Sequence, residues 1–257
     1  MLPAYDPPRG KPLGTNATFK ICASILIPIL NLITRRDWQG AKNIPATGPV
    51  IVISNHLSYL DVLVFAQFLY KNGRAPRFLG KESIFKVPFV GKILLGAGQI
   101  PVSRESPDAS KALDNALAVL RVGHMFGVYP EGTLTRDPDG WPMVAKTGLA
   151  RLAIITRAPV IPIAQWGSQD VMPTYSKKIK IFPRTIIHLH AGPPLDFSPW
   201  FGKENDPEAL TQATAYAMGV LTSMLEEIRG EKRPANIFDP HTSDLPRTGN
   251  FKRKSQS

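Results

Sequence analysis

Short apolar runs rich in β-branched residues recur along this chain, and segments with helical character separate several of them. The runs lie at residues 50–54, 76–80, 99–103, 126–130, 160–164 and 184–190. Runs of this length and composition are typical of strands buried within a sheet. Because such strands alternate with helices, the sequence predicts an α/β fold with a mixed, largely parallel sheet flanked by helices. In such sheets, functional sites gather where strands end and helices begin.

Two helices have clear boundary signals. A helix is expected over 107–122, with Ser106 as its N-cap and Gly123 just past its end. A second helix is expected over 207–229, where Asp206 provides the N-cap and apolar residues form one stripe.

The two ends of the chain differ from this pattern. Residues 17–33 are strongly apolar but fall short of the roughly 20 apolar residues of a spanning helix. Three residues interrupt the segment: Lys20, Pro28 and Asn31. We therefore expect residues 1–36 to form a membrane-associated segment at the lipid interface, with a true span or a buried core helix as alternatives. The α/β domain is expected over 37–230, and 231–257 should be a basic, disordered tail.

The charge balance indicates anionic partners. Lys and Arg number 31 against 20 acidic residues, for a net charge of +11. An acidic membrane surface and phosphorylated substrates fit this surplus. A nucleic-acid partner is not expected, because no recognised binding motif or aromatic-interleaved basic patch is present. The single cysteine, Cys22, excludes an internal disulfide and favours a reducing compartment. We therefore expect the protein at the cytoplasmic face of a membrane.

One strand-to-helix junction contains a histidine and a carboxylate. The segment VIVISNHLSYLD (50–61) leaves a buried strand and enters an apolar helix beginning near residue 58. On one continuous helix, His56 and Asp61 would point about 140° apart. They can meet only if His56 lies in the loop and folds back, where Asp61 would fix its tautomer and leave Nε2 free as a base. The alternative is that Asp61 caps the helix and His56 is an ordinary loop residue.

No nucleophile accompanies this pair. The sequence has no Gly-x-Ser-x-Gly elbow, and Cys22 lies in the apolar N-terminal segment. If His56 is a base, it should therefore activate a substrate hydroxyl directly. A metal is not expected, because the five histidines are scattered along the chain. His188 and His190 alternate within an expected strand, and we expect one side chain inward and the other outward.

Two further stretches are suited to binding an anion. In GVYPEGTLTR (127–136), Gly132 allows close backbone approach and Thr133 offers a hydroxyl and an amide to a phosphate. Glu131 is better suited to ordering the loop or binding a substrate hydroxyl, and an ordinary turn is the alternative. Arg104 ends an expected strand just before a helix N-terminus, a position that favours an anion but also an ordinary surface ion pair.

Together these stretches resemble the glycerolipid acyltransferase family of 1-acyl-sn-glycerol-3-phosphate acyltransferases. The resemblance runs from Pro49 to Ile163, nearly half of the chain. Its first block, H-x-x-x-x-D, matches His56 to Asp61. The other matching stretches are 80–94, between the first two blocks, and 98–104, 129–133 and 160–163, which resemble the second, third and fourth blocks.

The resemblance implies a reaction and a set of roles. His56 would be the general base and Asp61 its orienting carboxylate. The remaining site residues would hold the acceptor: Arg104, Glu131, Gly132 and Thr133. The acyl group would come from acyl-CoA or acyl carrier protein and pass to lysophosphatidate, with no cofactor and no metal. Alternatives are a related enzyme that uses glycerol 3-phosphate or another lysophospholipid, and a noncatalytic lipid-binding protein with the family fold.

Two departures from the family pattern concern phosphate recognition. Pro101 and Ser103 replace the aromatic residue and the acid that usually precede the arginine of the second block. Leu134 follows Thr133, where the family often has an arginine. Phosphate binding is therefore expected to depend on Arg104, with help from other basic residues. The candidates are Arg136, Arg77 and Lys81.

A second apolar stretch, at 83–98, combines large hydrophobic residues with Lys86 and Lys92. Such a pattern suits contact with an anionic bilayer. A core helix with solvated lysines is the alternative.

Overall fold

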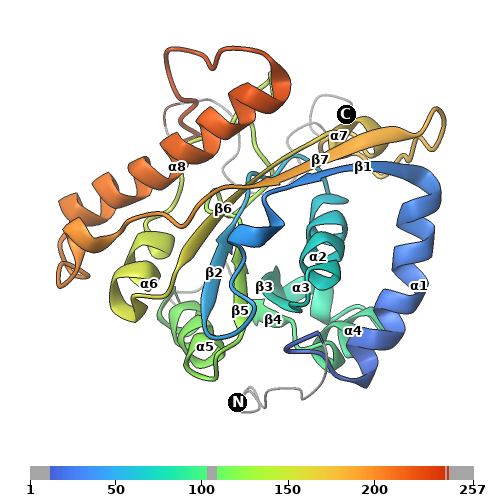
Figure 1. The fold of residues 1–257 in the computed structure, drawn as a ribbon, viewed down its shortest axis with the longest axis horizontal. Coiled ribbons are helices and arrows are strands. Elements are labelled where there is room, and N and C mark those ends of the chain that lie inside the picture. The colour runs from blue at the N-terminus through green and yellow to red at the C-terminus, as the bar shows by residue number, and fades with distance from the viewer. Residues whose placement is uncertain (1–11, 103–108, 241, 243–257) are drawn as a thin grey trace.

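A single twisted sheet forms the centre of the protein in a computed structural model that describes residues 12–102, 109–240 and 242 (Figure 1). The sheet is seven-stranded, with the order β1-β7-β6-β2-β5-β3-β4. The strands are β1 (Thr34–Gln39), β2 (Val50–Ile53), β3 (Pro76–Lys81), β4 (Ile100–Val102), β5 (Met125–Val128), β6 (Val160–Trp166) and β7 (Thr185–Ala191). Among these strands only the β6–β7 pairing is antiparallel. The carboxyl ends of β6, β2, β5, β3 and β4 therefore lie along one edge.

Helices cover both faces of the sheet (Figure 1). One face is covered by α1 (Ala17–Ile33) and α2 (Asp61–Lys71), with the short α3 (Glu82–Phe85) and α4 (Val90–Gly96) beside them. The other is covered by α5 (Ala109–Arg121), α6 (Gly148–Thr156) and α8 (Pro207–Arg229). The remaining short elements are α7 (Ser168–Val171), η1 (Ala41–Asn43) and η2 (Ser198–Trp200).

The alternation of side chains along β2 explains why both faces need cover. Ile51 and Ile53 pack into a core cluster with residues of α5, α6 and α8, whereas Val50 and Val52 pack into a second cluster with residues of α2. All four side chains are fully buried. A central parallel strand buried on both faces reads as a continuous apolar run, as this one does.

The predicted α/β architecture is confirmed, and each of the six expected strands is present, with its described ends within two residues of those expected. The strand end expected at 103 lies outside the described residues. The helix expected over 207–229 has those bounds, and the Asp206 side chain accepts from the amides of Glu208 and Ala209. The other expected helix is described from Ala109 to Arg121, and its expected cap lies outside the described residues. The sequence did not predict β1, a polar strand at the edge of the sheet.

The N-terminal apolar segment forms α1 and packs against the domain. Phe19, Ala23 and Leu30 are buried on one side of this helix, whereas Ile21 and Leu32 on the other are 60% and 74% exposed. No helix in the described part of the chain has the length and apolar character needed to cross a membrane. β1 begins at Thr34, so the strand extends across the expected boundary at residue 36.

The structure bears on two other expected segments, the stretch 83–98 and part of the tail. The stretch 83–98 is not a core helix, since it forms α3, a turn and α4, and most of its large apolar side chains are exposed. Among them, Phe89 is 80% exposed. In the tail, the carbonyl of Phe238 accepts from the Val144 amide. The expected disorder of the tail concerns mostly residues outside the described ones.

At the other end of the strands, the buried Arg74 joins the loops that precede β2 and β5. Arg74 is 0% exposed, and its guanidinium donates to three carbonyl oxygens, at 2.7, 2.7 and 3.3 Å. These belong to Pro45, Gly48 and Gly123, from two separate loops. Burial lowers the pKa of Arg74.

We predict that Arg74→Met lowers the free energy of unfolding by about 3 kcal/mol, because three carbonyls lose their donors. Urea unfolding followed by circular dichroism measures this loss. Arg121→Met, at an exposed position on α5, is the matched control and should change stability by less than about 0.5 kcal/mol. Equal losses in the two variants would mean that the three carbonyl contacts do not stabilise the fold.

Candidate active site

The loops that follow β2, β5 and β6 meet at one edge of the sheet. β2 pairs in parallel with β5 on one side and β6 on the other, so their carboxyl ends are neighbours. The pairing of β2 with β6 continues past the strand end, because the Asn55 side chain exchanges hydrogen bonds with the backbone of Gln165 at 2.9 Å. The backbone of the loop that follows is therefore held in place before His56.

Asp61 organises the loop between β2 and α2. Its Oδ2 accepts from Nδ1 of His56 at 2.9 Å and from the amides of Leu57 and Ser58 at 2.5 and 2.8 Å. Its Oδ1 accepts from the hydroxyl of Ser168, at the start of α7. The carboxylate is fully buried. The expected meeting of His56 and Asp61 is confirmed, and the capping alternative is wrong, because Asp61 binds amides of the preceding loop and not of the helix.

The ring of His56 is held on two sides. Because Oδ2 of Asp61 is surrounded by N–H donors, Nδ1 of His56 carries the proton in this contact and Nε2 is left as an acceptor. The ring stacks on Tyr129, with centroids 4.0 Å apart and planes 19° apart. The His56 side chain is 14% exposed, so part of it reaches solvent. Such an imidazole is oriented for proton transfer.

Glu131 fastens the loop after β5 to the histidine loop. Its Oε1 accepts from the His56 amide at 3.2 Å, and its Oε2 accepts from the Met143 amide at 3.1 Å. Burial, reinforced by the nearby Asp61, raises the pKa of Glu131 to about 8. The side chain therefore carries a proton at neutral pH and does not oppose a phosphate. These contacts give Glu131 the loop-ordering role, and its contact with substrate stays a prediction.

Lys146 lies beside Gly132, and the sequence analysis did not identify it as a site residue. Gly132 has φ +71°, a conformation that favours glycine. A Cβ at Gly132 would lie 3.2 Å from Cε and 3.4 Å from Nζ of Lys146, so the lysine side chain lies directly over this glycine. The Lys146 amide donates to the Pro130 carbonyl at 3.0 Å, which holds the two segments together. Lys146 is therefore an exposed cation beside the His56 loop.

The other predicted anion-binding residues lie in different settings. Arg104 is outside the described residues. Arg77 and Arg136 are 0% and 2% exposed, so both lie inside the fold. Arg77 donates to the Gly14 carbonyl, which is a structural contact. Lys81 is exposed at the carboxyl end of β3, on the same edge of the sheet as His56.

Tyr175 forms hydrogen bonds with the loop after β5, at Thr133 and Leu134. Thr133 is half-buried, and its side chain hydrogen-bonds with the Tyr175 hydroxyl. The hydroxyl of Tyr175 also donates to the Leu134 carbonyl at 2.9 Å. Burial raises the pKa of Tyr175. The predicted contact of Thr133 with a phosphate is not tested by this arrangement and stays a prediction.

Sequence reasoning missed Ser168 as well as Lys146. Ser168 follows Gly167 at the end of β6, and the rule that parallel strands end at a common edge was the available signal. Lys146 carried no comparable signal, because its approach to Gly132 depends on the path of the 134–147 loop.

The two strand histidines were predicted wrongly. His188 and His190 are two residues apart on β7, and such residues share one face of a strand. Both are half-buried, and both contact Oδ2 of Asp37, at 2.8 and 2.9 Å. The expectation of one inward and one outward side chain is therefore corrected.

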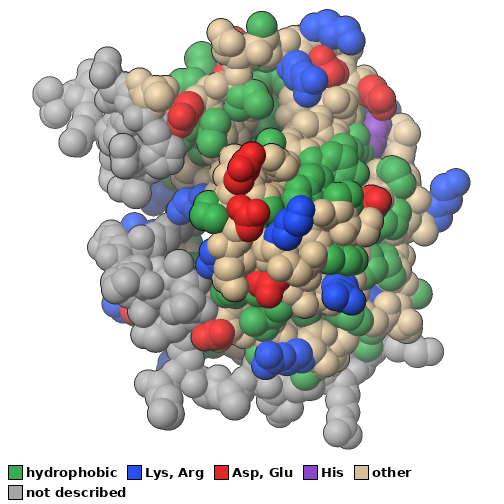
Figure 2. Space-filling model, turned by 90° about the vertical axis from the view of Figure 1, so that its left-hand side faces the viewer, with side chains coloured by type: hydrophobic (Ala, Val, Ile, Leu, Met, Phe, Trp, Pro, Cys, Tyr) green, Lys and Arg blue, Asp and Glu red, His purple; other side chains and the backbone are tan. Residues whose placement is uncertain are grey.

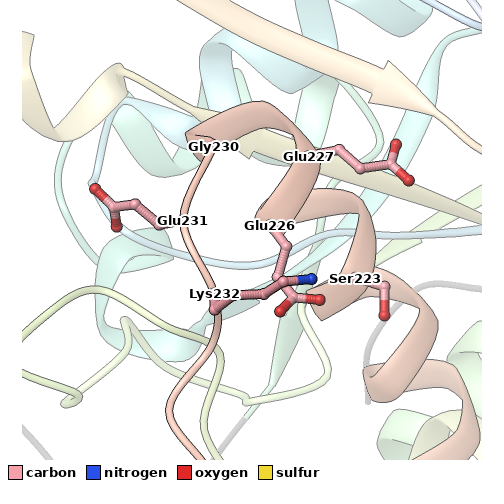
Figure 3. A pocket seen from close by; sticks show the side chains of 6 residues that line it. All are labelled: Ser223, Glu226, Glu227, Gly230, Glu231 and Lys232. Atoms are coloured by element: carbon pink, nitrogen blue, oxygen red, sulfur yellow. The ribbon is translucent and has the colours of Figure 1, made fainter.

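A separate hollow of about 340 Å³ lies at the end of α8 (Figure 3). Its lining includes three carboxylates, those of Glu226, Glu227 and Glu231, with Lys232 beside Glu226 in Figure 3. An acidic lining is unsuited to a phosphorylated ligand, and His56 is not part of it.

Known proteins resemble this chain in sequence. A profile of the Acyltransferase family matches residues 35–166, just over half of the 257-residue chain and including His56, Asp61 and Glu131. A chloroplastic 1-acyl-sn-glycerol-3-phosphate acyltransferase of Brassica napus is 32% identical over 60% of this chain and 44% of its own length. Proteins with the same enzyme name from Borreliella burgdorferi and Bacillus subtilis are 30% and 26% identical.

The extent of these matches differs. The alignment spans 60% of the Borreliella burgdorferi protein and all of the Bacillus subtilis protein, with 61% and 82% of this chain. The fold is also similar to the crystal structure of the 1-acyl-sn-glycerophosphate acyltransferase of Thermotoga maritima, with a TM-score of 0.64 at 24% identity. That similarity covers 84% of this chain and 81% of the other. With the match of the family profile over half its length, the chain belongs to the Acyltransferase family.

Proposed function

We propose that this protein transfers a fatty acyl group from acyl-CoA or acyl carrier protein to the free hydroxyl of lysophosphatidate, giving phosphatidate. The observation that carries the proposal is the His56–Asp61 contact of 2.9 Å, which leaves Nε2 of His56 as the acceptor. The enzyme name shared by the relatives from Brassica napus, Borreliella burgdorferi and Bacillus subtilis supports the choice of acceptor.

The proposed reaction is a direct transfer. Nε2 of His56 takes the proton of the acceptor hydroxyl while the hydroxyl oxygen attacks the thioester carbonyl carbon. The resulting tetrahedral oxyanion then collapses, the C–S bond breaks, and the thiolate takes the proton back from the imidazolium. Asp61 stabilises the imidazolium between these steps through Nδ1. The step needs no oxidant or further reactant.

The hydroxyls near His56 support transfer without an acyl-enzyme. Ser58 donates its hydroxyl to the Met172 carbonyl at 2.6 Å, and Ser168 donates its hydroxyl to Asp61. Both protons are therefore directed away from Nε2 of His56. The one cysteine, Cys22, lies on α1, and burial raises the pKa of its thiol, which reduces its nucleophilicity at neutral pH.

We assign acceptor-phosphate binding to the cations at the carboxyl edge of the sheet. Lys146 lies over Gly132, in the loop that Glu131 fastens to His56, and Lys81 is exposed at the end of β3. Lys146 would supply a charge that Leu134 cannot. Arg104 remains part of this proposal from its place in the sequence after β4.

The exposed apolar surface of α1, α3 and α4 would contact an anionic membrane. Ile21, Ile25 and Leu32 on α1 are 60%, 56% and 74% exposed. α1 and α4 contact one another, so the apolar side chains of α4 extend the same surface. On the side shown in Figure 2, by contrast, hydrophobic, basic and acidic side chains are interspersed. Lys86 and Lys92 in the same stretch are exposed, and an apolar surface with such cations suits an interface with acidic lipid.

The base can be tested with two substitutions. We predict that His56→Ala lowers kcat by at least about 10³-fold, since no other group takes the hydroxyl proton. Asp61→Asn should retain weak activity, because the imidazole remains but loses its charge support. The measurement is transfer from labelled acyl-CoA, with circular dichroism to verify the fold.

The matched control is Asp114→Asn, at an exposed position on α5, which should leave kcat unchanged. Turnover of folded His56→Ala protein near the wild-type rate would refute the base.

Lys146→Ala should raise KM for lysophosphatidate about tenfold and leave KM for the acyl donor nearly unchanged, because one exposed charge-assisted contact is lost. Steady-state kinetics with monoacylglycerol as a second acceptor isolates the phosphate, since this substrate should be insensitive to the substitution. Lys71→Ala is the matched control, because Lys71 lies about 15 Å along α2 from Asp61. A parallel rise in KM for both substrates would make Lys146 a structural residue.

Membrane contact is best tested by point substitution, because a deletion of α1 would also expose its buried side. We predict that a variant with Ile21→Ser, Ile25→Ser and Leu32→Ser binds anionic vesicles more weakly while its activity on dispersed short-chain substrates is retained. Co-sedimentation across a salt series measures binding, which should weaken with salt for the wild type.

The control carries serine at Val122 and Ile237, which are exposed elsewhere. If the α1 variant and this control sedimented like the wild type, with no preference for acidic lipid, the proposed membrane surface would be wrong.

A further inference from the structure

Three side chains that can bind a metal meet on the face of the sheet opposite α2. Asp37 lies on β1, and His188 and His190 lie on β7. β1 and β7 pair in parallel, with Asp37 opposite His188 and Gln39 opposite His190. The positions of the three side chains are therefore set by the backbone pairing of two adjacent strands.

The ligand atoms are already close to one another. Oδ2 of Asp37 lies 2.8 Å from Nδ1 of His188 and 2.9 Å from Nε2 of His190, and the three atoms lie within 4.8 Å of one another. The two imidazole rings are nearly perpendicular, at 72°, so they do not stack. Around a tetrahedral Zn²⁺ such atoms lie about 3.3 Å apart, so the Asp37 oxygen would move away from each nitrogen by roughly 0.5 Å to admit the ion.

We propose that Asp37, His188 and His190 form a binding site for a divalent transition metal of the Zn²⁺ type, with one position open to water. Two imidazoles and one carboxylate suit Zn²⁺ and its neighbours in the series, whereas Mg²⁺ and Ca²⁺ prefer oxygen ligands. The side chains are 27%, 22% and 36% exposed for His188, His190 and Asp37, which gives an ion a path from solvent.

The surroundings favour the ion over competing contacts. On β6, the neighbours of the histidines are Trp166 and Ala164, which offer no carboxylate or amine. The guanidinium of Arg36 lies over Trp38 at 5.1 Å, and residues 36 and 38 face the side of the sheet away from Asp37. Arg35 shares the face of Asp37 but is exposed to solvent, which screens its charge.

A metal bound at Asp37, His188 and His190 would link the edge strand β1 to β7. In the described chain β1 pairs only with β7, and α1 ends at Ile33, directly before β1. A metal shared by Asp37 and the two histidines would therefore tie the strand that follows α1 to the rest of the domain. The site is structural in this inference and does not depend on the proposed acyl transfer.

The experiment uses the full chain, purified without a histidine tag and treated with chelator, and titrates it with CoCl₂ and ZnCl₂. We expect one equivalent of Co²⁺ to give visible d–d bands that Zn²⁺ displaces. At a free zinc concentration a hundredfold above Kd, the melting temperature should rise by about 5 °C. MgCl₂ should produce neither effect.

A double variant separates metal binding from hydrogen bonding. His188→Asn and His190→Gln place amide N–H groups near the original Nδ1 and Nε2, so the contacts to Asp37 can persist while the imidazole ligands are lost. This variant should keep its melting temperature without metal and lose both the bands and the zinc shift. His56→Asn, the matched control, should keep both.

Absence of stoichiometric Co²⁺ and Zn²⁺ binding at millimolar metal would overturn the proposal and leave a hydrogen-bonded cluster only. Unchanged binding in the double variant, or its loss in His56→Asn, would also overturn it, because the metal would then lie elsewhere. Should the double variant fail to fold, single substitutions of His188 and His190 that each weaken Zn²⁺ binding would support the site.

Discussion

The buried carboxylate of Asp61 is the interaction on which the site depends. A buried carboxylate is stable only when hydrogen bonds replace the water it has lost. Here the replacements come from two amides of the β2–α2 loop, the His56 ring and the Ser168 hydroxyl. Because these donors belong to loops after two neighbouring strands, satisfying one carboxylate fixes the relative positions of both. The orientation of His56 follows from this requirement.

The sheet makes that arrangement possible. β2 is central and pairs in parallel with both β5 and β6, so the pairing itself brings the loops that follow these three strands to one end of the sheet. At the amino ends of the strands, Arg74 donates hydrogen bonds to carbonyl oxygens of two loops. A buried acid near one end of the strands and a buried base near the other thus fasten the chain where the regular hydrogen bonding of the sheet ends. Both groups do so through charge-assisted bonds, which are stronger than neutral ones.

The sequence predicted the parts of the fold that depend on apolar pattern. The six strands expected from β-branched runs are present, because strands buried on both faces leave a pattern that local context does not change. β1 was missed because it is an edge strand that is partly solvated. Its three consecutive charged residues, Arg35, Arg36 and Asp37, interrupt the alternation of apolar and polar residues that identifies a strand. The end of α5 and the start of α8 followed from Gly123 and Asp206, whose roles are local.

The site was predictable only where its geometry is local. The spacing of His56 and Asp61 required a folded-back loop, and that loop is present. By contrast, Lys146 reaches Gly132 through a loop of irregular structure, and Ser168 reaches Asp61 across the sheet. Arg77 and Arg136 were reasonable candidates in the sequence, and because both are buried, their part in phosphate binding stays a prediction. Contacts between distant segments depend on packing, which a single sequence does not encode as a pattern.

The proton on Glu131 has a consequence for how the site responds to alkali. Its pKa of about 8 in the folded chain exceeds the ordinary value of 4.5, so folding takes up a proton between these values and loses stability as pH rises through that window. The cost comes from burial, and the amides of His56 and Met143, which donate to Glu131, offset part of it. Above pH 8 the carboxylate is ionised while buried, and the loss of stability would lower the hydrogen-exchange protection factors of the two amides, after correction for faster intrinsic exchange in alkali. Alkali would thus destabilise the region where Glu131 joins the loop after β5 to the His56 loop.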